Sequence, residues 1–235
     1  MANYETHRNV GIGVTVITTA SILLLINNDY KFLDVNLEMN LLTILLMIWV
    51  GILGSILPDI DLKTSRPSLY FRKITYLLTI IASIIFINNN EENLISITKE
   101  IDIYIVYPIF MLVGLFLNYI FIKIFENSMR HRGLVHSIPF AIVLSIILYL
   151  ILRYGQETLN LNAEINSALV SLLLFVGFIT HLILDELYSI DFNNRKIKKS
   201  FGSALSLFDT KNPIGSIILY IVIILFTNNY IISLI

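Results

Sequence analysis

Apolar residues recur along the chain in seven long stretches separated by short polar segments. The stretches run roughly over residues 9–27, 39–57, 71–88, 102–123, 137–153, 166–188 and 213–230. A bilayer core of about 30 Å requires about 20 mostly apolar residues per helix. The third stretch is short and polar at both ends, and Asn228 and Asn229 interrupt the last one. The pattern predicts an all-α, polytopic membrane helical bundle of about seven transmembrane helices, the seventh being the interrupted one.

The composition supports a membrane protein. Of the 235 residues, 56% are hydrophobic and 14% are charged, and the mean hydropathy is +0.79. Soluble domains average about 45–50% apolar and about 25% charged residues, so a soluble enzyme is close to excluded. The net charge of −1 argues against a nucleic-acid partner. No proline- or serine-rich linker and no repeat divides the chain, so we expect one integral-membrane domain over residues 1–235.

Basic residues indicate how the spans are oriented. If residues 1–8, 58–73, 123–136 and 189–212 share one side of the membrane, that side holds thirteen Lys and Arg residues, and the other side holds three. The three are Lys31, Lys99 and Arg153. Because Lys and Arg favour cytoplasmic loops, we expect a cytoplasmic N-terminus in the cytoplasmic (inner) membrane of a bacterium or archaeon.

All four histidines fall at this predicted cytoplasmic face. His7 precedes the first span, His131 and His136 precede the fifth, and His181 lies in the last turns of the sixth. The chain has no cysteine, so thiolate sites and disulfides are impossible. Any metal bound at this face must therefore be held by nitrogen and oxygen ligands.

His181 and Asp185 lie four residues apart in the sixth span, so they share one face of that helix. Ionisable side chains within a membrane helix are costly and face the bundle or a wet cavity. One interpretation is that the two side chains bind a metal ion. The other is a hydrogen bond between them that tightens helix packing. The metal interpretation is favoured.

Two carboxylates, Asp59 and Asp61, follow Pro58 at the end of the second span. The proline ends the helical pattern, so we expect both carboxylates at the membrane interface rather than in lipid. Carboxylates this close repel each other unless a cation lies between them, and a divalent metal would remove that conflict. A solvated loop with helix-capping aspartates explains the same residues equally well.

Between His131 and His136 lies Gly133, which indicates a turn that leads into a helix. Imidazole is a common ligand of zinc and also suits iron and manganese. Arg130 and Arg132 could hold phosphate oxygens through paired hydrogen bonds. For Arg130, contact with lipid headgroups is the favoured interpretation.

Several other chemistries lack their sequence motifs. The chain has no His-Glu-x-x-His helix, no Gly-x-Ser-x-Gly elbow and no Walker loop. The basic segment over residues 195–202 could lie on the anionic inner leaflet or fold over the site, and an ordinary cytoplasmic loop explains its charge equally well. Because the polar residues gather at one face, the sequence favours an interfacial site over a conduction path.

Four motifs occur in a characteristic order. They are Thr6-His7-x-x-x-Gly11, Leu57-Pro58-Asp59-Ile60-Asp61 with Ser65, His131-Arg132-Gly133-x-x-His136-Ser137, and Gly177-x-x-x-His181-x-x-x-Asp185. Together they resemble the YdjM family of membrane-bound, metal-dependent hydrolases, and the stretch 199–205 is similar to one branch of it. Each motif alone is weak, but four in this order over residues 6 to about 205 make a specific match.

The resemblance implies a set of metal ligands. These are His7, Asp59, Asp61, His131, His136, His181 and Asp185. The pattern of the family is similar to that of helical zinc-dependent phospholipases C and nucleases, which cleave phosphoesters at a site of clustered metals. Seven candidate ligands exceed the need of one zinc ion, so we expect one or two divalent ions, with zinc favoured over manganese or iron.

We therefore expect a hydrolase at the cytoplasmic leaflet that cleaves a phosphoester of a lipid or lipid-linked substrate with a metal-activated water. Asp59 or Asp61 would act as general base, and Arg132 would hold the phosphate oxygens. The expected partners are membrane lipids and no nucleic acid. Two alternatives stay open: a zinc-dependent lipid amidase with ceramidase-like chemistry, and a non-enzymatic metal-binding or structural membrane protein.

Overall fold

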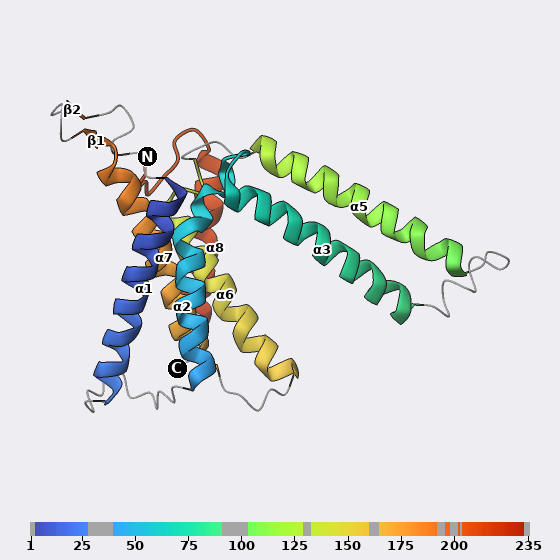
Figure 1. Ribbon diagram of the computed structural model, residues 1–235, viewed down its shortest axis with the longest axis horizontal. Helices are drawn as coiled ribbons and strands as arrows, with labels where there is room; N and C mark the ends of the chain where they lie inside the picture. Colours follow the sequence, from blue (N-terminus) through green and yellow to red (C-terminus); the bar gives the residue numbers. More distant parts are fainter. Residues whose placement is uncertain are drawn as a thin grey trace. The chain divides into compact units, whose positions relative to one another are not determined.

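The computed structural model confirms the all-α architecture (Figure 1). It describes residues 3–27, 40–90, 103–128, 133–159, 165–191, 196–197, 202 and 204–232. In these ranges the α-helices are α1 (Tyr4–Asn27), α2 (Leu41–Ile56), α3 (Arg66–Asn89), α5 (Ile103–Ser128), α6 (Ile138–Leu159), α7 (Ser167–Leu187) and α8 (Pro213–Ile232). A short 3-10 helix, η1 (Leu57–Asp61), continues α2 directly. Strands β1 (Ile190–Asp191) and β2 (Lys196–Ile197) form an antiparallel pair that the sequence did not predict.

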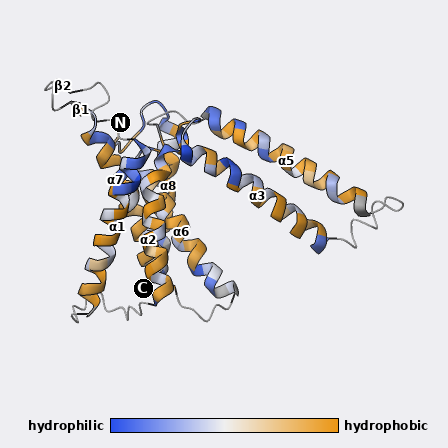
Figure 2. Cartoon of the chain, viewed as in Figure 1, coloured by the Kyte–Doolittle hydropathy of each residue, from blue (hydrophilic) through white to orange (hydrophobic). Residues whose placement is uncertain are grey.

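Six of the described helices are long and apolar enough to cross a membrane, and α8 supplies a shorter apolar helix over Pro213–Asn228. Figure 2 shows that hydrophobic residues predominate along the helices. Large apolar side chains are widely exposed, including Ile17 at 68% and Trp49 at 60%. Patches of this extent are unfavourable in water and fit contact with lipid. The prediction of a polytopic helical membrane protein is confirmed.

The third span is longer than the predicted 71–88, because α3 already begins at Arg66. The side chain of Ser65 accepts a hydrogen bond from the backbone N–H of Ser68 at 3.1 Å, which caps the new helix. Pro67 lies in the first turn, where its missing N–H removes no helical hydrogen bond. The cap and the proline together explain a start that the hydrophobic pattern alone does not mark.

The described chain forms two compact units. The first comprises residues 1–59 and 131–235, and the second comprises residues 60–130. In the first unit α7 packs against α1, α2 and α6, and α6 also packs against α8. The centre of this packing contains Met47 and Val50 of α2 with Val170 and Leu173 of α7. The assignment of residues 1–235 to one domain stays a prediction.

Glycines allow the central helices of the first unit to approach each other at backbone distance. A Cβ atom added to Gly177 of α7 would collide with the carbonyl oxygen of Gly51 in α2. A Cβ atom added to Gly11 of α1 would collide with the side chain of Ser55 in α2. Small residues at helix crossings permit such close contact in membrane proteins. The close approach brings the ends of α1, α2 and α7 together.

The second unit is an antiparallel pair of helices, α3 and α5. The start of α3 meets the end of α5, where Arg72 Nη1 lies 2.8 Å from Glu126 Oε1. The other ends of the two helices meet through Ile87 and Val106, which are both buried. The unit is thus held by an ion pair at one end and apolar contact at the other.

Candidate metal centre

Five buried ionisable side chains meet at one end of the first unit. They come from four segments: His7 from the first turns of α1, Asp59 from η1, His136 from the residues before α6, and His181 with Asp185 from the last turns of α7. Each of the three histidines and Asp185 is 0% exposed, and Asp59 is 6% exposed. Burial of so many ionisable groups is costly unless they are paired or coordinate a metal. The cluster therefore requires a chemical explanation.

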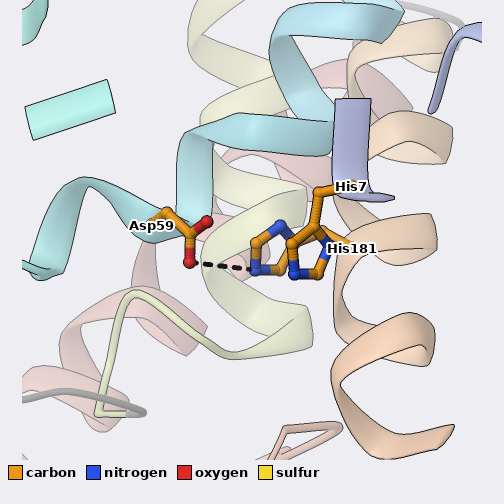
Figure 3. A group of neighbouring side chains, drawn as sticks. All are labelled: His7, Asp59 and His181. Atoms are coloured by element: carbon orange, nitrogen blue, oxygen red, sulfur yellow. Dashed lines mark ion pairs between the residues drawn. The ribbon is translucent and has the colours of Figure 1, made fainter. Parts of the chain in front are cut away.

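His181 has a fixed orientation. Its Nδ1 lies 2.8 Å from the backbone carbonyl oxygen of Ser55. A carbonyl oxygen can only accept, so Nδ1–H is the donor and Nε2 of the neutral ring carries a lone pair. That Nε2 lies 3.6 Å from Oδ1 of Asp59. A dashed line marks this pair in Figure 3. A histidine held by a backbone carbonyl in this way is the usual arrangement of a metal ligand.

His7 stacks on His181. The ring centroids are 3.7 Å apart and the rings are inclined by 13°, and Figure 3 shows the two rings lying one over the other. Nε2 of His7 also lies 3.3 Å from Oδ1 of Asp185. An imidazole lone pair lies in the plane of its ring, so the two stacked rings hold their lone pairs in nearly parallel planes.

His136 approaches the cluster from the turn before α6. Its backbone N–H donates to the carbonyl oxygen of Gly133 at 2.9 Å, which closes the turn that the glycine predicted. Its Nε2 lies 3.9 Å from Oδ2 of Asp185, and its ring lies edge-on to that of His181 at 5.4 Å. Asp185 thus faces His7 with one carboxylate oxygen and His136 with the other.

Two groups of three residues within the cluster could hold a metal ion. One is His7, Asp59 and His181, and the other is His136, His181 and Asp185. In each group, one ligand atom per residue lies within 4.8 Å of the others. His181 belongs to both groups but has a single nitrogen available, because Ser55 occupies the other. The two groups therefore compete for His181.

All three histidine–carboxylate distances are longer than a direct hydrogen bond, and two of them match the spacing of ligand atoms around a metal ion. The three histidine–carboxylate separations are 3.3, 3.6 and 3.9 Å, whereas N–H···O hydrogen bonds measure about 2.7–3.2 Å. Ligand atoms about 2.0–2.2 Å from a tetrahedral zinc lie about 3.3–3.6 Å from one another. Within the described residues, both ring nitrogens of His7 and Nε2 of His181 lack a hydrogen-bond partner. The alternative to a metal site is a hydrogen-bonded network that tightens helix packing, and it leaves these buried atoms unexplained.

The other predicted site residues have different outcomes. His131 and Arg132 lie outside the described residues, as does Arg130. Asp61 is the last residue of η1 and is counted with the second unit. The assignments of His131 and Asp61 as ligands, and of Arg132 as a phosphate-binding residue, stay predictions.

Sequence reasoning missed the backbone carbonyl of Ser55, which orients His181. Every residue has such a carbonyl, so no sequence signal marks this one. The near contact of Gly11 with Ser55 and of Gly177 with Gly51 identifies the helix crossing that brings it into place. The sequence does offer a hint of this crossing: Gly11 in α1 and Gly177 in α7 each lie one helical turn from a histidine.

Comparison with known proteins identifies a family whose model covers the cluster. The family model described as YdjM inner membrane protein matches residues 1–194, which include all five residues of the cluster. No curated protein and no solved structure matches the chain. The chain therefore belongs to the YdjM family and is a multi-pass inner membrane protein with buried His/Asp groups that could hold a metal ion.

Proposed function

We propose that this protein is a metal-dependent hydrolase that cleaves a phosphoester of a lipid or lipid-linked substrate at the membrane interface. The observation that carries the proposal is the convergence of three imidazoles and two carboxylates, all buried, from four separate segments. Burial of five ionisable groups is costly, and a bound metal ion would offset that cost. Family membership supports the same conclusion, because the matched region contains the whole cluster.

The residues present fit a divalent ion with nitrogen and oxygen ligands. His7, His136, His181, Asp59 and Asp185 would hold it, and zinc, manganese and iron all accept such a set. When bound, the ion lowers the pKa of a coordinated water and stabilises negative charge on phosphate oxygens. The number of ions, one or two, depends on which group uses His181.

The protein residues have their own roles in this proposal. The Ser55 carbonyl holds the Nδ1 proton of His181 and so keeps Nε2 directed at the cluster. Asp59 would accept a proton from the attacking water if it is not occupied as a ligand. Arg132 is proposed to hold the phosphate oxygens through paired hydrogen bonds, and Asp61 is the alternative to Asp59 as general base.

The depth of the cluster favours a lipid substrate. The cluster lies at the ends of membrane-length helices: near the starts of α1 and α6 and in the last turns of α7. A site at that depth meets headgroups that diffuse in the leaflet. We propose that this end faces the cytoplasm, because the sequence predicts most Lys and Arg residues on the same side of the membrane as residues 1–8.

The test compares products formed by purified, metal-loaded protein from phospholipid and prenyl-phosphate vesicles. We expect phosphate or a phosphorylated headgroup to be released by the wild type and not by His181→Ala. Thr180→Ala serves as the matched control, because its hydroxyl bonds only within α7, to the carbonyl of Val176. Release of fatty acid instead, from vesicles that also contain an amide-linked lipid, would support the amidase alternative. Bound metal without any product would favour a non-enzymatic role.

A further inference from the structure

Glu186, the residue after Asp185 in α7, binds the backbone of a distant loop. Its carboxylate accepts hydrogen bonds from the backbone N–H of Gly202 and, at 3.2 Å, from that of Ala204. Glu186 has no role in the proposed reaction, although it is next to Asp185, a candidate metal ligand. A carboxylate that accepts two backbone N–H groups makes charge-assisted bonds that are stronger than neutral ones.

The same loop binds the segment that carries His136. We call Gly202 and residues 204–206 the strap. The carbonyl oxygen of Ser206 accepts the backbone N–H of Ile138 at 3.1 Å, so it satisfies one of the free donors at the start of α6. The hydroxyl of Ser206 donates to the carbonyl oxygen of His136 at 3.4 Å. The strap therefore holds the backbone on both sides of Ser137.

The strap has a defined local conformation. Gly202 has a φ of +81°, a value that glycine adopts without the steric cost of a side chain. Ala204 is 0% exposed, so this part of the strap packs inward. Gly202 lies two residues before Ala204, and the backbone N–H groups of both donate to Glu186.

Glu186 stands at an electrostatically unfavourable position. The last turn of α7 carries two adjacent acidic residues, Asp185 and Glu186, at the negative end of the helix dipole. Local rules favour basic residues at such a helix end. The two N–H donors of the strap offset this electrostatic cost for Glu186. An acidic residue at a helix end that favours basic residues indicates a role beyond helix formation.

We propose that Glu186 is a positioning residue for the metal centre, which acts through the strap to set the place of His136 relative to Asp185 and His181. The inference rests on the proposed metal centre but not on its reaction or substrate. Asp185 and Glu186 are neighbours in α7, so the hydrogen bonds of Glu186 connect the strap to one of the candidate carboxylate ligands. His136 is tied to them by backbone hydrogen bonds rather than by chain connectivity. The strap lies beyond the matched region 1–194 and overlaps the stretch 199–205 that is similar to one branch of the family.

The test measures Co²⁺ binding by the purified full chain, using the affinity and the visible absorption of the bound ion. Glu186→Gln keeps the size of the side chain but loses the second acceptor oxygen. Because changes to groups that orient ligands typically cost 10–100-fold in metal affinity, we expect about a tenfold loss and an altered Co²⁺ spectrum. Glu5→Gln is the matched control: it removes the same charge two residues from His7 without touching the strap, and we expect no change.

A double-mutant cycle separates positioning from general stability. If Glu186 acts through His136, Glu186→Gln has no further effect on Co²⁺ affinity in a His136→Ala background. Additive losses would overturn the inference, as would a wild-type affinity and spectrum in Glu186→Gln itself.

Ser206→Ala provides a second test if Glu186→Gln does not fold. It removes only the hydroxyl that binds the His136 carbonyl, and we expect a loss of a few-fold in Co²⁺ affinity with an unchanged unfolding temperature of the metal-free protein. An unchanged affinity would contradict the inference. Failure of the wild type to bind Co²⁺ would instead overturn the metal centre itself, so the two failures are distinguishable.

Discussion

Nδ1 of His181 donates a hydrogen bond of 2.8 Å to the backbone carbonyl of Ser55, one helix away. This bond leaves His181 with a single nitrogen for the cluster, although His181 belongs to both groups that could hold an ion. His7 and His136 each belong to only one group. His181 is therefore the residue on which the candidate centre depends most.

Replacement of His181 should have the largest effect on metal binding. We expect His181→Ala to lower the affinity for Zn²⁺ by more than about 100-fold, the upper range for residues that only orient ligands. His7→Ala and His136→Ala should each cost less, because one group of three remains. Competition with a chromophoric chelator measures all three. Equal losses in the three variants would show that the ligands form one indivisible set.

Gly177 should not tolerate a side chain. In Gly177→Ala the new Cβ would collide with the Gly51 carbonyl, a backbone atom that cannot rotate away. Overpacking of this kind costs about 1–3 kcal/mol and would shift α7 with its two cluster residues. Thermal unfolding in detergent should show a lower midpoint, together with weaker metal binding.

Gly13→Ala is the control for that variant. Nothing lies within 4 Å of a Cβ atom added at this position of α1. Alanine has a higher helix propensity than glycine by up to about 1 kcal/mol, so the midpoint should stay unchanged or rise. A similar fall in both variants would show that the close contact of α7 with α2 is not the cause.

Gln156 should matter for stability without affecting the metal centre. Its amide nitrogen donates to the carbonyls of Leu152 and Ile165 and to the hydroxyl of Ser167, and its oxygen accepts the N–H of Ile165 at 2.7 Å. In Gln156→Glu a carboxylate oxygen would face two carbonyls, and we expect a loss of about 1–3 kcal/mol. The metal content should be that of the wild type.

Thr158→Ala, which removes an exposed hydroxyl in the same helix, provides the comparison for Gln156→Glu and should be neutral. Gln156 lies near the end of α6, whereas His136 lies before its start, so the two residues are at opposite ends of this helix. Loss of metal in Gln156→Glu would contradict the expectation that the far end of α6 does not affect the metal centre.

The orientation in the membrane can be tested directly because the chain has no cysteine. Glu5 lies in the first turn of α1 and Thr158 in the last turn of α6, so single cysteines there mark opposite ends of the bundle. An impermeant maleimide should label Thr158→Cys in intact cells and Glu5→Cys only after permeabilisation. The reverse pattern would place the cluster outside the cytoplasm.

Much of the fold is predictable from the sequence because lipid imposes a simple rule. Each span must be long, apolar and helical, so the hydrophobic pattern alone predicts the helices. Helix ends are less visible: α3 begins at Arg66 because of the Ser65 cap, not because of hydropathy. The β1–β2 pair was missed because four residues in two short strands leave no periodic signal.

The candidate site was predictable in its residue types but not in its internal contacts. The i,i+4 spacing of His181 and Asp185 predicts that they share one helix face, and in the structure both belong to one buried group with His136. The stack of His7 on His181 depends on how α1 crosses α7, which the sequence does not reveal. Glu186 was overlooked as well, because its partners are backbone N–H groups more than ten residues away.

Metal content is the most direct test of the central claim. The wild type, purified in detergent and repleted with Zn²⁺, Mn²⁺ or Fe²⁺, is compared by elemental analysis with a His181→Ala, Asp185→Ala double variant. The account predicts one or two equivalents of a divalent metal in the wild type and loss of that metal in the double variant. A correctly folded wild type that retains no divalent metal after repletion would contradict it, and the buried cluster would then be a helix-packing network.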